Sequence, residues 1–103
     1  PEPPDFSISL HDLDRVIEIR PDWAIPYFNK GNILLAQKKY DEAIKYFSIA
    51  VKKEPGLAEA YFNRGLTQIF LNRLEYGCSD LSQAGELGIN EAYKAINRFC
   101  FKN

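Results

Sequence analysis

The sequence has few of the residues from which active sites and metal sites are built. Its 103 residues include one histidine, His11, and two cysteines, Cys78 and Cys100. His11 lies among acidic residues, with no serine or cysteine spaced to act as a catalytic partner, so we interpret it as a solvated surface residue. The three residues form no cluster with metal-ligand spacing, and no glycine-rich loop follows a strand. We therefore predict that the protein is not an enzyme and uses no metal or other cofactor.

Charge and hydropathy exclude two further kinds of partner. Thirteen Lys and Arg against fourteen Asp and Glu give a net charge of -1, without the basic excess that nucleic acids or anionic membranes attract. No apolar run approaches the roughly 18 residues that a spanning helix needs, and the N-terminus lacks the features of a signal peptide. We predict no nucleic-acid partner and no membrane insertion. Because the initiator methionine is missing, we interpret the chain as a processed form or an excised piece, so a cytoplasmic and a periplasmic location both stay open.

An internal repeat is the main feature that the sequence does have. The segment Tyr27–Gly31, YFNKG, returns as Tyr61–Gly65, YFNRG, and Pro21 and Pro55 have the same separation. Self-similarity at this period indicates one supersecondary unit stacked on itself. Apolar residues recur at helical spacing between turn residues, and nothing alternates with period two. We therefore predict an all-α fold of about six helices without strands.

Prolines, glycines and charges predict where these helices begin and end. We expect helices over about 6–20, 26–37, 41–53, 58–71, 74–87 and 90–101, after an extended segment at 1–5. Asp5 and Asn90 are the expected N-caps, Pro26 is expected in a first turn, and Gly88 is expected in the left-handed conformation. Short connections make neighbouring helices antiparallel.

The spacing of large and small residues resembles the tetratricopeptide repeat. The first copy matches at Tyr27, Gly31, Leu34, Ala43, Phe47, Ala50 and Pro55. The second matches at Tyr61, Gly65, Leu81 and Ala84, departs at Gln68 and Gly77, and has Ile89 in place of the proline. Ser9, Leu13, Val16 and Pro21 fit the second helix of a preceding copy. The resemblance implies a right-handed α-solenoid of antiparallel helix pairs, with a partial repeat at 6–22, a full repeat at 23–56 and a degenerate full repeat at 57–89.

The closing segment resembles the end of certain bacterial repeat proteins. The shared features are Gly77–Leu81, a Leu-Gly turn at Leu87–Gly88, then Ala92–Tyr93 and a final Cys100. This resemblance implies that 90–103 is a capping helix and not the start of another full repeat.

The two cysteines are predicted to face each other. Cys78 and Cys100 are equally far from Ile89 along the chain, one before it and one after it. An antiparallel helix pair that turns near Ile89 therefore places them opposite each other. A disulfide needs Cα atoms within about 7 Å, and both a bridge and two packed thiols remain open. The C-x-x-C spacing of a catalytic redox pair is absent.

In the family, one face of each repeat's first helix lines a concave groove that binds peptides. The equivalent positions here are Ile25, Phe28, Asn29, Asn32, Leu35, Ala36, Glu59, Phe62, Asn63, Leu66, Ile69 and Phe70. Several are large and apolar, which predicts that something covers them. The alternative is that they pack on the capping helix or belong to a broad core stripe.

The predicted groove lacks most of the basic residues that would bind the terminal carboxylate of a peptide. Asn32 and Asn63 coincide with the asparagines that hold a peptide's end carboxylate in the chaperone-binding members. Phe28, however, stands where a lysine is expected. Tyr93 and Asn97 stand where bases are expected, with Lys94 and Arg98 only adjacent to those positions. We therefore favour a generic apolar peptide groove over a carboxylate clamp.

The resemblance implies a non-enzymatic scaffold that binds an extended peptide or a partner helix in its concave groove. The alternative is a structural or self-association segment of a longer repeat protein. Phe6, Leu10 and Leu13 lack the helix that would precede them, so we expect missing chain or a second copy to cover them, the latter giving a homodimer through the N-terminal helix. A regulatory part of a catalytic protein is a third interpretation, with no residue in its favour.

Overall fold

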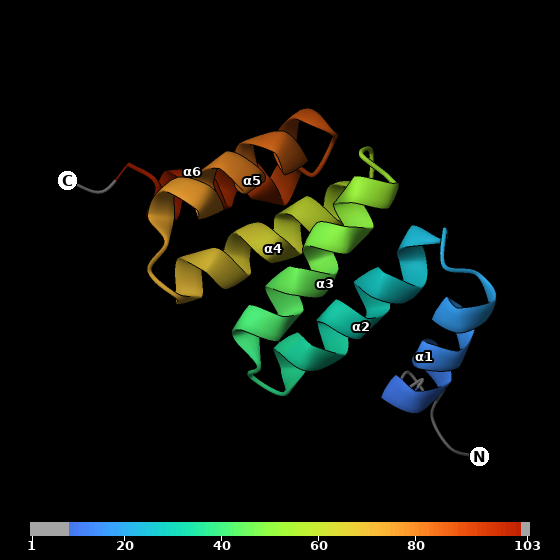
Figure 1. Ribbon diagram of the computed structural model, residues 1–103. Coiled ribbons are helices and arrows are strands. Elements are labelled where there is room, and N and C mark those ends of the chain that lie inside the picture. The colour runs from blue at the N-terminus through green and yellow to red at the C-terminus, as the bar shows by residue number, and fades with distance from the viewer. Residues whose placement is uncertain (1–8, 102–103) are drawn as a thin grey trace, which may run out of the picture.

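In the computed structural model, which describes residues 9–101, six helices form a curved stack that runs from α1 at one end to α6 at the other (Figure 1). The helices are α1 (Leu10–Ile19), α2 (Ala24–Ala36), α3 (Tyr40–Lys53), α4 (Ala58–Phe70), α5 (Leu74–Glu86) and α6 (Asn90–Phe99). No strand occurs within residues 9–101. The predicted all-α fold is therefore confirmed.

The helix starts differ from the sequence prediction at three places. Ser9 caps α1, since its Oγ accepts a hydrogen bond from the Asp12 amide at 3.1 Å, whereas the expected cap Asp5 lies outside the described residues. Pro26 is the third residue of α2 and not the first, which costs nothing because the first backbone amides of a helix have no partner within the helix. The prediction that Asn90 caps α6 is wrong: Ile89 occupies the cap and Asn90 is already helical.

Three of the turns contain a residue in the left-handed conformation. Gly88 has φ +113°, as predicted. Lys38 and Asn72 have φ values of 63° and 60°, and they occupy the same place after α2 and α4, one repeat period apart. A left-handed residue after the last helical turn lets the chain reverse direction in a short connection. The turn geometry thus repeats although its sequence does not.

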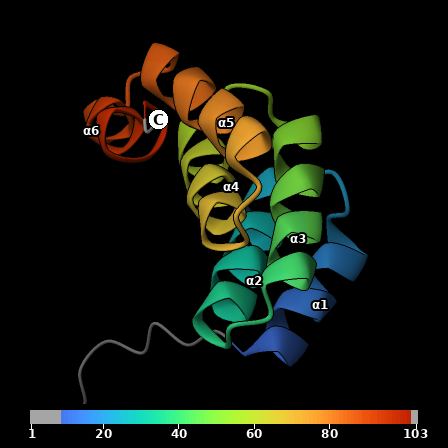
Figure 2. The ribbon, with the colours of Figure 1, turned by 90° about the vertical axis from the view of Figure 1, so that its left-hand side faces the viewer.

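Helix pairs are the packing unit. α2 packs mainly against α3, and α4 against α5. Contacts between α3 and α4 stack the second pair on the first, and α6 packs on α5 at the end of the stack. Figure 2 shows α6 on the side of α5 that is remote from α3. Each pair crosses closely because of glycine: a Cβ added to Gly31 would lie 2.7 Å from the ring of Phe47, which is fully buried. α1 packs on α2.

A largely buried ion pair joins α4 to α5, and its arginine also reaches the neighbouring helix pair. The Arg64 guanidinium of α4 donates two hydrogen bonds of 2.7 Å to the Asp80 carboxylate of α5, and a third, of 3.0 Å, to Ser48 Oγ of α3. The hydrogen bonds to Asp80 raise the pKa of Arg64 above its ordinary value, against the opposing effect of burial. Arg64 therefore stays charged and connects three helices.

No helix within residues 9–101 is long and apolar enough to cross a membrane.

Candidate functional site: the face of α2 and α4

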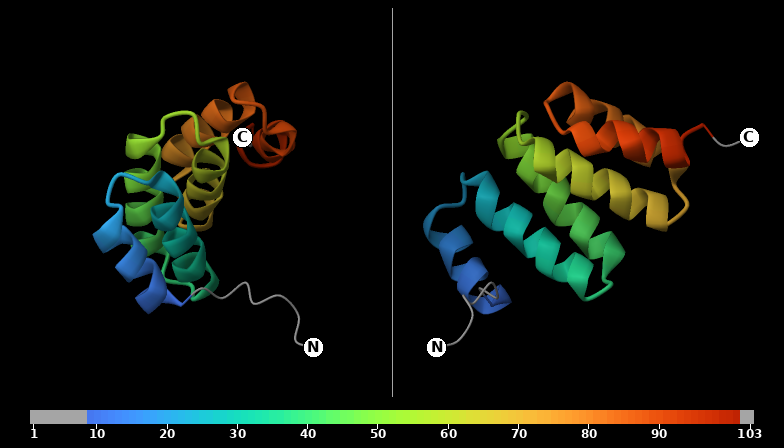
Figure 3. Two further views of the ribbon diagram at one scale, coloured as in Figure 1. Left: turned by 90° about the vertical axis from the view of Figure 1, so that its right-hand side faces the viewer. Right: turned by 180° about the vertical axis from the view of Figure 1, so that it is seen from behind.

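The candidate site is the face that the first helices of the two repeats share. α2 and α4 touch each other directly, and Figure 3 shows the stack from two further sides. A polar contact between the two helices joins two predicted groove residues: Asn63 Nδ2 donates a 2.8 Å hydrogen bond to Asn32 Oδ1. Both asparagines are half-buried. The structure therefore brings together the two amides that the sequence singled out.

The apolar residues expected on this face divide into two groups. Phe62 and Leu66 of α4 are half-buried and lie in no buried cluster. Leu35 packs partly against the cluster of Leu34, Ala43 and Phe47. Phe28 lies deeper, with its ring centroid 5.9 Å from that of Phe47. Phe28 therefore belongs largely to the hydrophobic core, which is the alternative that the sequence left open for these residues.

Two predicted residues lie away from the shared face. Ile69 packs against α5, since a Cβ on Gly77 would lie 2.8 Å from Ile69 Cδ1; the expectation that it points away from that helix is wrong. Phe70 is 61% exposed at the end of α4, with its ring centroid 6.1 Å from that of Tyr40 at the start of α3. Ala36 and Glu59 of the predicted set are exposed.

A hollow of about 590 Å³ adjoins the site where α1 meets α2. Its lining includes Ile25 and Asn29 of the groove set together with Leu13 and Val16 of α1. Trp23 also lines it and is 46% exposed. The contribution of α1 is missed at the level of sequence, because the repeat period says nothing about a helix without a partner.

α1 is held beside this hollow by Lys30 of α2. The Lys30 ammonium donates a hydrogen bond to Asp14 of α1 and lies 4.4 Å from the ring centroid of Tyr46 in α3. Burial alone lowers the pKa of Lys30, but the hydrogen bonds with Asp14 and Tyr46 outweigh it, so the pKa lies above the ordinary 10.5. One cation thus connects three helices at this end of the stack.

At the other end, α6 stands where the first helix of a third repeat would stand. Ala92 is fully buried, like Ala60 of α4, and the Tyr93 ring lies over Gly85, where an added Cβ would come within 2.8 Å of it. Ala92 thus matches Ala60 in a register that is slightly shorter than the repeat period. This shorter register places the exposed Lys94 and Arg98 at the positions that Phe62 and Leu66 hold in α4.

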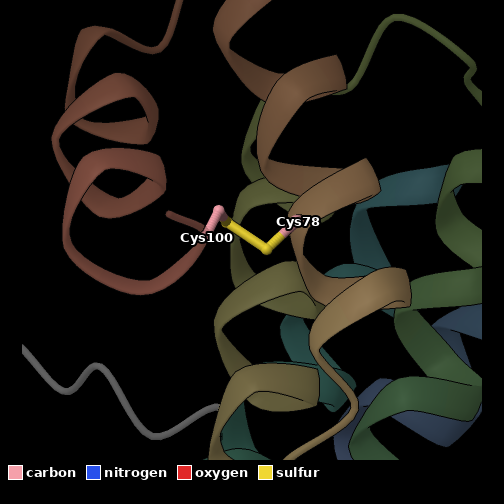
Figure 4. Close-up of a disulfide and its surroundings, with 2 residues drawn as sticks. All are labelled: Cys78 and Cys100. Atoms are coloured by element: carbon pink, nitrogen blue, oxygen red, sulfur yellow. A yellow bond between two sulfur atoms is a disulfide. The ribbon is translucent and has the colours of Figure 1, made fainter. Parts of the chain in front are cut away.

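A disulfide joins α6 to α5. Cys78 and Cys100 are bonded through their sulfurs, with a Cα–Cα distance of 5.9 Å. Figure 4 shows Cys78 on α5 and Cys100 at the end of α6. The sequence prediction places the two residues opposite each other and leaves a bridge and packed thiols open; the structure has the bridge. In residues 9–101 no group of three metal-ligating side chains is brought together.

Known proteins resemble both the sequence and the structure. Residues 24–57 match the family model of the tetratricopeptide repeat. A UDP-N-acetylglucosamine–peptide N-acetylglucosaminyltransferase of Giardia intestinalis is 30% identical over 91 residues, covering 88% of this chain and 6% of the relative. The Hsp70-Hsp90 organizing protein 3 of Arabidopsis thaliana is 38% identical over 91 residues, covering 82% of this chain and 16% of the relative.

The relatives are much longer and come from eukaryotes. The chain spans 6% to 23% of the length of the seven curated relatives. They come from Giardia, human and plants, so they give no support to the bacterial type expected from the closing segment.

A solved structure shares the fold over most of the chain. The first tetratricopeptide domain of Spaghetti (RPAP3), solved with an HSP90 peptide, superposes with a TM-score of 0.85 at 20% identity, over 92% of this chain and 77% of that chain. At this identity the likeness shows the fold alone. The chain therefore contains a tetratricopeptide repeat at residues 24–57 and folds as a tetratricopeptide-repeat protein.

Proposed function

We propose that this chain is a non-enzymatic protein-interaction scaffold whose concave face, built on α2 and α4, binds an extended peptide or a partner helix. The carrying observation is the hydrogen bond between Asn32 and Asn63, flanked by the half-buried Phe62 and Leu66. A side-chain amide both donates and accepts, so the pair can bind the backbone of an extended ligand. Neighbouring apolar residues would bury the ligand's side chains.

The comparisons support peptide binding by a domain of this fold. The Spaghetti domain was solved with the HSP90 peptide SRMEEVD, and the Arabidopsis relative is named as an organizer of Hsp70 and Hsp90. This chain differs at the place where a charged ligand end would need a cation, because Phe28 is packed against Phe47 there. We therefore propose an apolar ligand segment for this face.

The test is a binding measurement with selected peptides. A phage-displayed peptide library is selected against the whole chain, and the best peptide is compared with SRMEEVD by calorimetry. We expect Phe62→Ala combined with Asn63→Asp to weaken the best peptide at least tenfold, because apolar area is lost and a carboxylate faces Asn32 Oδ1. SRMEEVD should bind at least tenfold more weakly than the best peptide.

Tyr76→Ala is the matched control, since this aromatic residue of α5 is 68% exposed and lies outside the proposed face. It should leave the affinity unchanged. An unchanged melting temperature in the Phe62/Asn63 variant, together with lost binding, supports the groove. Equal affinity of the variant and the parent would contradict it, and loss of folding in the variant supports a structural role instead.

We also propose that 90–103 caps the stack after the repeats at 6–22, 23–56 and 57–89. In the register that aligns Ala92 with Ala60, Asn97 stands where α4 has the buried Gly65. A Cβ on Gly65 would lie 3.0 Å from Gly77 O in the paired helix, so an asparagine there leaves no room for a second helix to cross as closely. α6 is therefore suited to end the stack.

The alternative, self-association through α1, is favoured by the apolar hollow that Val16 and Trp23 line. The expectation that Leu13 needs a cover is wrong, since the described helices already bury it to 2% exposure. A homodimer through this helix would cover the hollow. Sedimentation velocity over a wide concentration range tests this: a dimer is expected, and Val16→Asp should return it to a monomer. A monomer at high concentration in which α1 amides are protected from exchange would rule the dimer out.

A further inference from the structure

α6 is attached to α5 at both of its ends. The turn of residues 87–89 joins its start to α5, and the Cys78–Cys100 disulfide joins its end to the same helix (Figure 4). Among the described residues, α5 is also its main packing partner. The position of α6 is therefore decided by one interface and one covalent bond.

The noncovalent part of this attachment buries few whole side chains of α6. Ala92 is the only fully buried residue of α6, and its side chain is a single methyl group. Tyr93 lies over Gly85 but is 49% exposed, and Ile96 and Phe99 are half-buried. Within residues 9–101 no ion pair and no hydrogen bond between side chains joins α6 to another helix.

We propose that the Cys78–Cys100 disulfide is a redox latch: when it is intact α6 is held on α5, and when a dithiol reduces it α6 is released. Both cysteines are half-buried and not fully enclosed, so a thiolate can reach the bond. The reductant's first thiolate attacks one sulfur to form a mixed disulfide, and its second thiolate displaces the protein sulfur. The sulfur–sulfur bond of the protein takes up two electrons and two protons, giving two thiols, and the dithiol becomes a disulfide.

Release of α6 changes the end of the proposed groove, and this part of the inference rests on the proposed function. Lys94 and Arg98, at the register positions of Phe62 and Leu66, would leave the stack together with α6. The surface of α5 around Gly85 and Cys78, now under α6, would become accessible. The latch thereby sets whether the stack ends in a polar cap or in the uncovered side of α5.

The size of the effect follows from loop closure. The bond closes a loop with a sequence separation of 22, and a cross-link over a loop of this length shifts the equilibrium toward the closed state by about three hundredfold. After reduction of the disulfide, the apolar contacts between α6 and α5 alone hold α6 in place. We expect the amides of α6 to lose at least tenfold of their protection from hydrogen exchange after reduction.

The test is hydrogen-exchange mass spectrometry of the whole chain before and after treatment with dithiothreitol. Faster exchange in 92–99 with unchanged exchange in α2 to α4 supports the latch. Three results overturn it: free thiols at both cysteines in the air-oxidised chain, equal protection of α6 in both states, or loss of protection in all six helices together.

Two variants make the test specific. Cys78→Ser combined with Cys100→Ser should show the fast exchange of α6 with or without dithiothreitol, and an effect of the reductant on this variant would overturn the proposal. Gly85→Ala, which crowds the Tyr93 ring, should leave α6 protected while the disulfide is intact and speed its exchange further after reduction. Neither readout needs a peptide, so failure of every peptide to bind would refute the proposed function and leave the latch result intact.

Discussion

Single glycines control how closely the helices of a pair approach. Gly31 is buried, and a Cβ at its position would lie 2.7 Å from two ring atoms of Phe47. Phe47 is itself fully buried, so its ring has little space into which to move. The smallest residue is required at this crossing because a ring fills the space that a side chain would take.

Gly31→Ala should therefore destabilise the chain. We expect the free energy of unfolding to fall by about 1–3 kcal/mol, the range for overpacking a filled core, as measured by urea denaturation. Gly56→Ala is the matched control, since no atom lies within 4 Å of its added Cβ, and it should raise stability by about 0.4–1 kcal/mol. Equal effects of the two substitutions would show that the crossing is not tightly packed.

For single residues, the sequence predicts which positions lie at a helix crossing better than it predicts which side chains touch there. The repeat period assigns Gly31, Ala43 and Phe47 to the helix crossing because it puts small and large residues opposite each other, and all three are buried. Ile69 is misplaced because Gly77 lacks the methyl group of Ala43 in the first copy, and the isoleucine fills the space left. The repeat pattern assigns each position to a helix face, but it does not show that a smaller residue on one helix lets a larger residue on the other helix fill the space.

Whole helices are predicted within a few residues, because prolines and charged turns mark their ends. The left-handed conformation of Lys38 could not be predicted, since lysine has no preference for it. Asn72 carries a weak signal, because asparagine adopts this conformation more readily than most residues. The register of α6 also could not be predicted, because the turn before it is shorter than the repeat period requires. A strict period would align Tyr93 with Glu59 of α4, whereas in the structure Tyr93 aligns with Tyr61. Tertiary contact with Gly85 decides that register.

The attachment of α1 gives a prediction at the scale of one helix. Lys30→Met removes the ammonium that contacts Asp14 and Tyr46 and keeps a similar volume. We expect the docking of α1 to weaken by about 1 kcal/mol, as for a partly exposed charged contact, so its amides should exchange roughly fivefold faster.

Lys45→Met controls for the loss of a positive charge near Tyr46, because Lys45 is exposed and lies 5.6 Å from the same ring centroid. It should leave the exchange of α1 unchanged. If both variants speed the exchange equally, general electrostatics and not the Lys30 contact holds α1.

The whole molecule is a short stack in which each helix pair contacts only its neighbours, so its cooperativity depends on the interfaces between pairs. The interface between the two full pairs contains half-buried groove residues and the hydrogen bond from Arg64 of α4 to Ser48 of α3. The same guanidinium is held by Asp80 of α5, within the second pair. Arg64 and Asp80 have side chains that are 19% and 10% exposed. A charge left alone in such a place is costly, because water cannot replace the missing partner.

Asp80→Asn should therefore lower the free energy of unfolding by about 3 kcal/mol, near the range for breaking a buried pair from one side. Asp41→Asn is the control, because the Arg73–Asp41 pair has side chains that are 44% and 75% exposed and should contribute less than about 1 kcal/mol. Replacing both partners, Arg64→Met with Asp80→Leu, removes the unpaired charge and should recover most of the loss. Urea denaturation measures the free energy of unfolding of all three variants. Equal losses in Asp80→Asn and Asp41→Asn would mean that the Arg64–Asp80 pair contributes no more than an exposed ion pair.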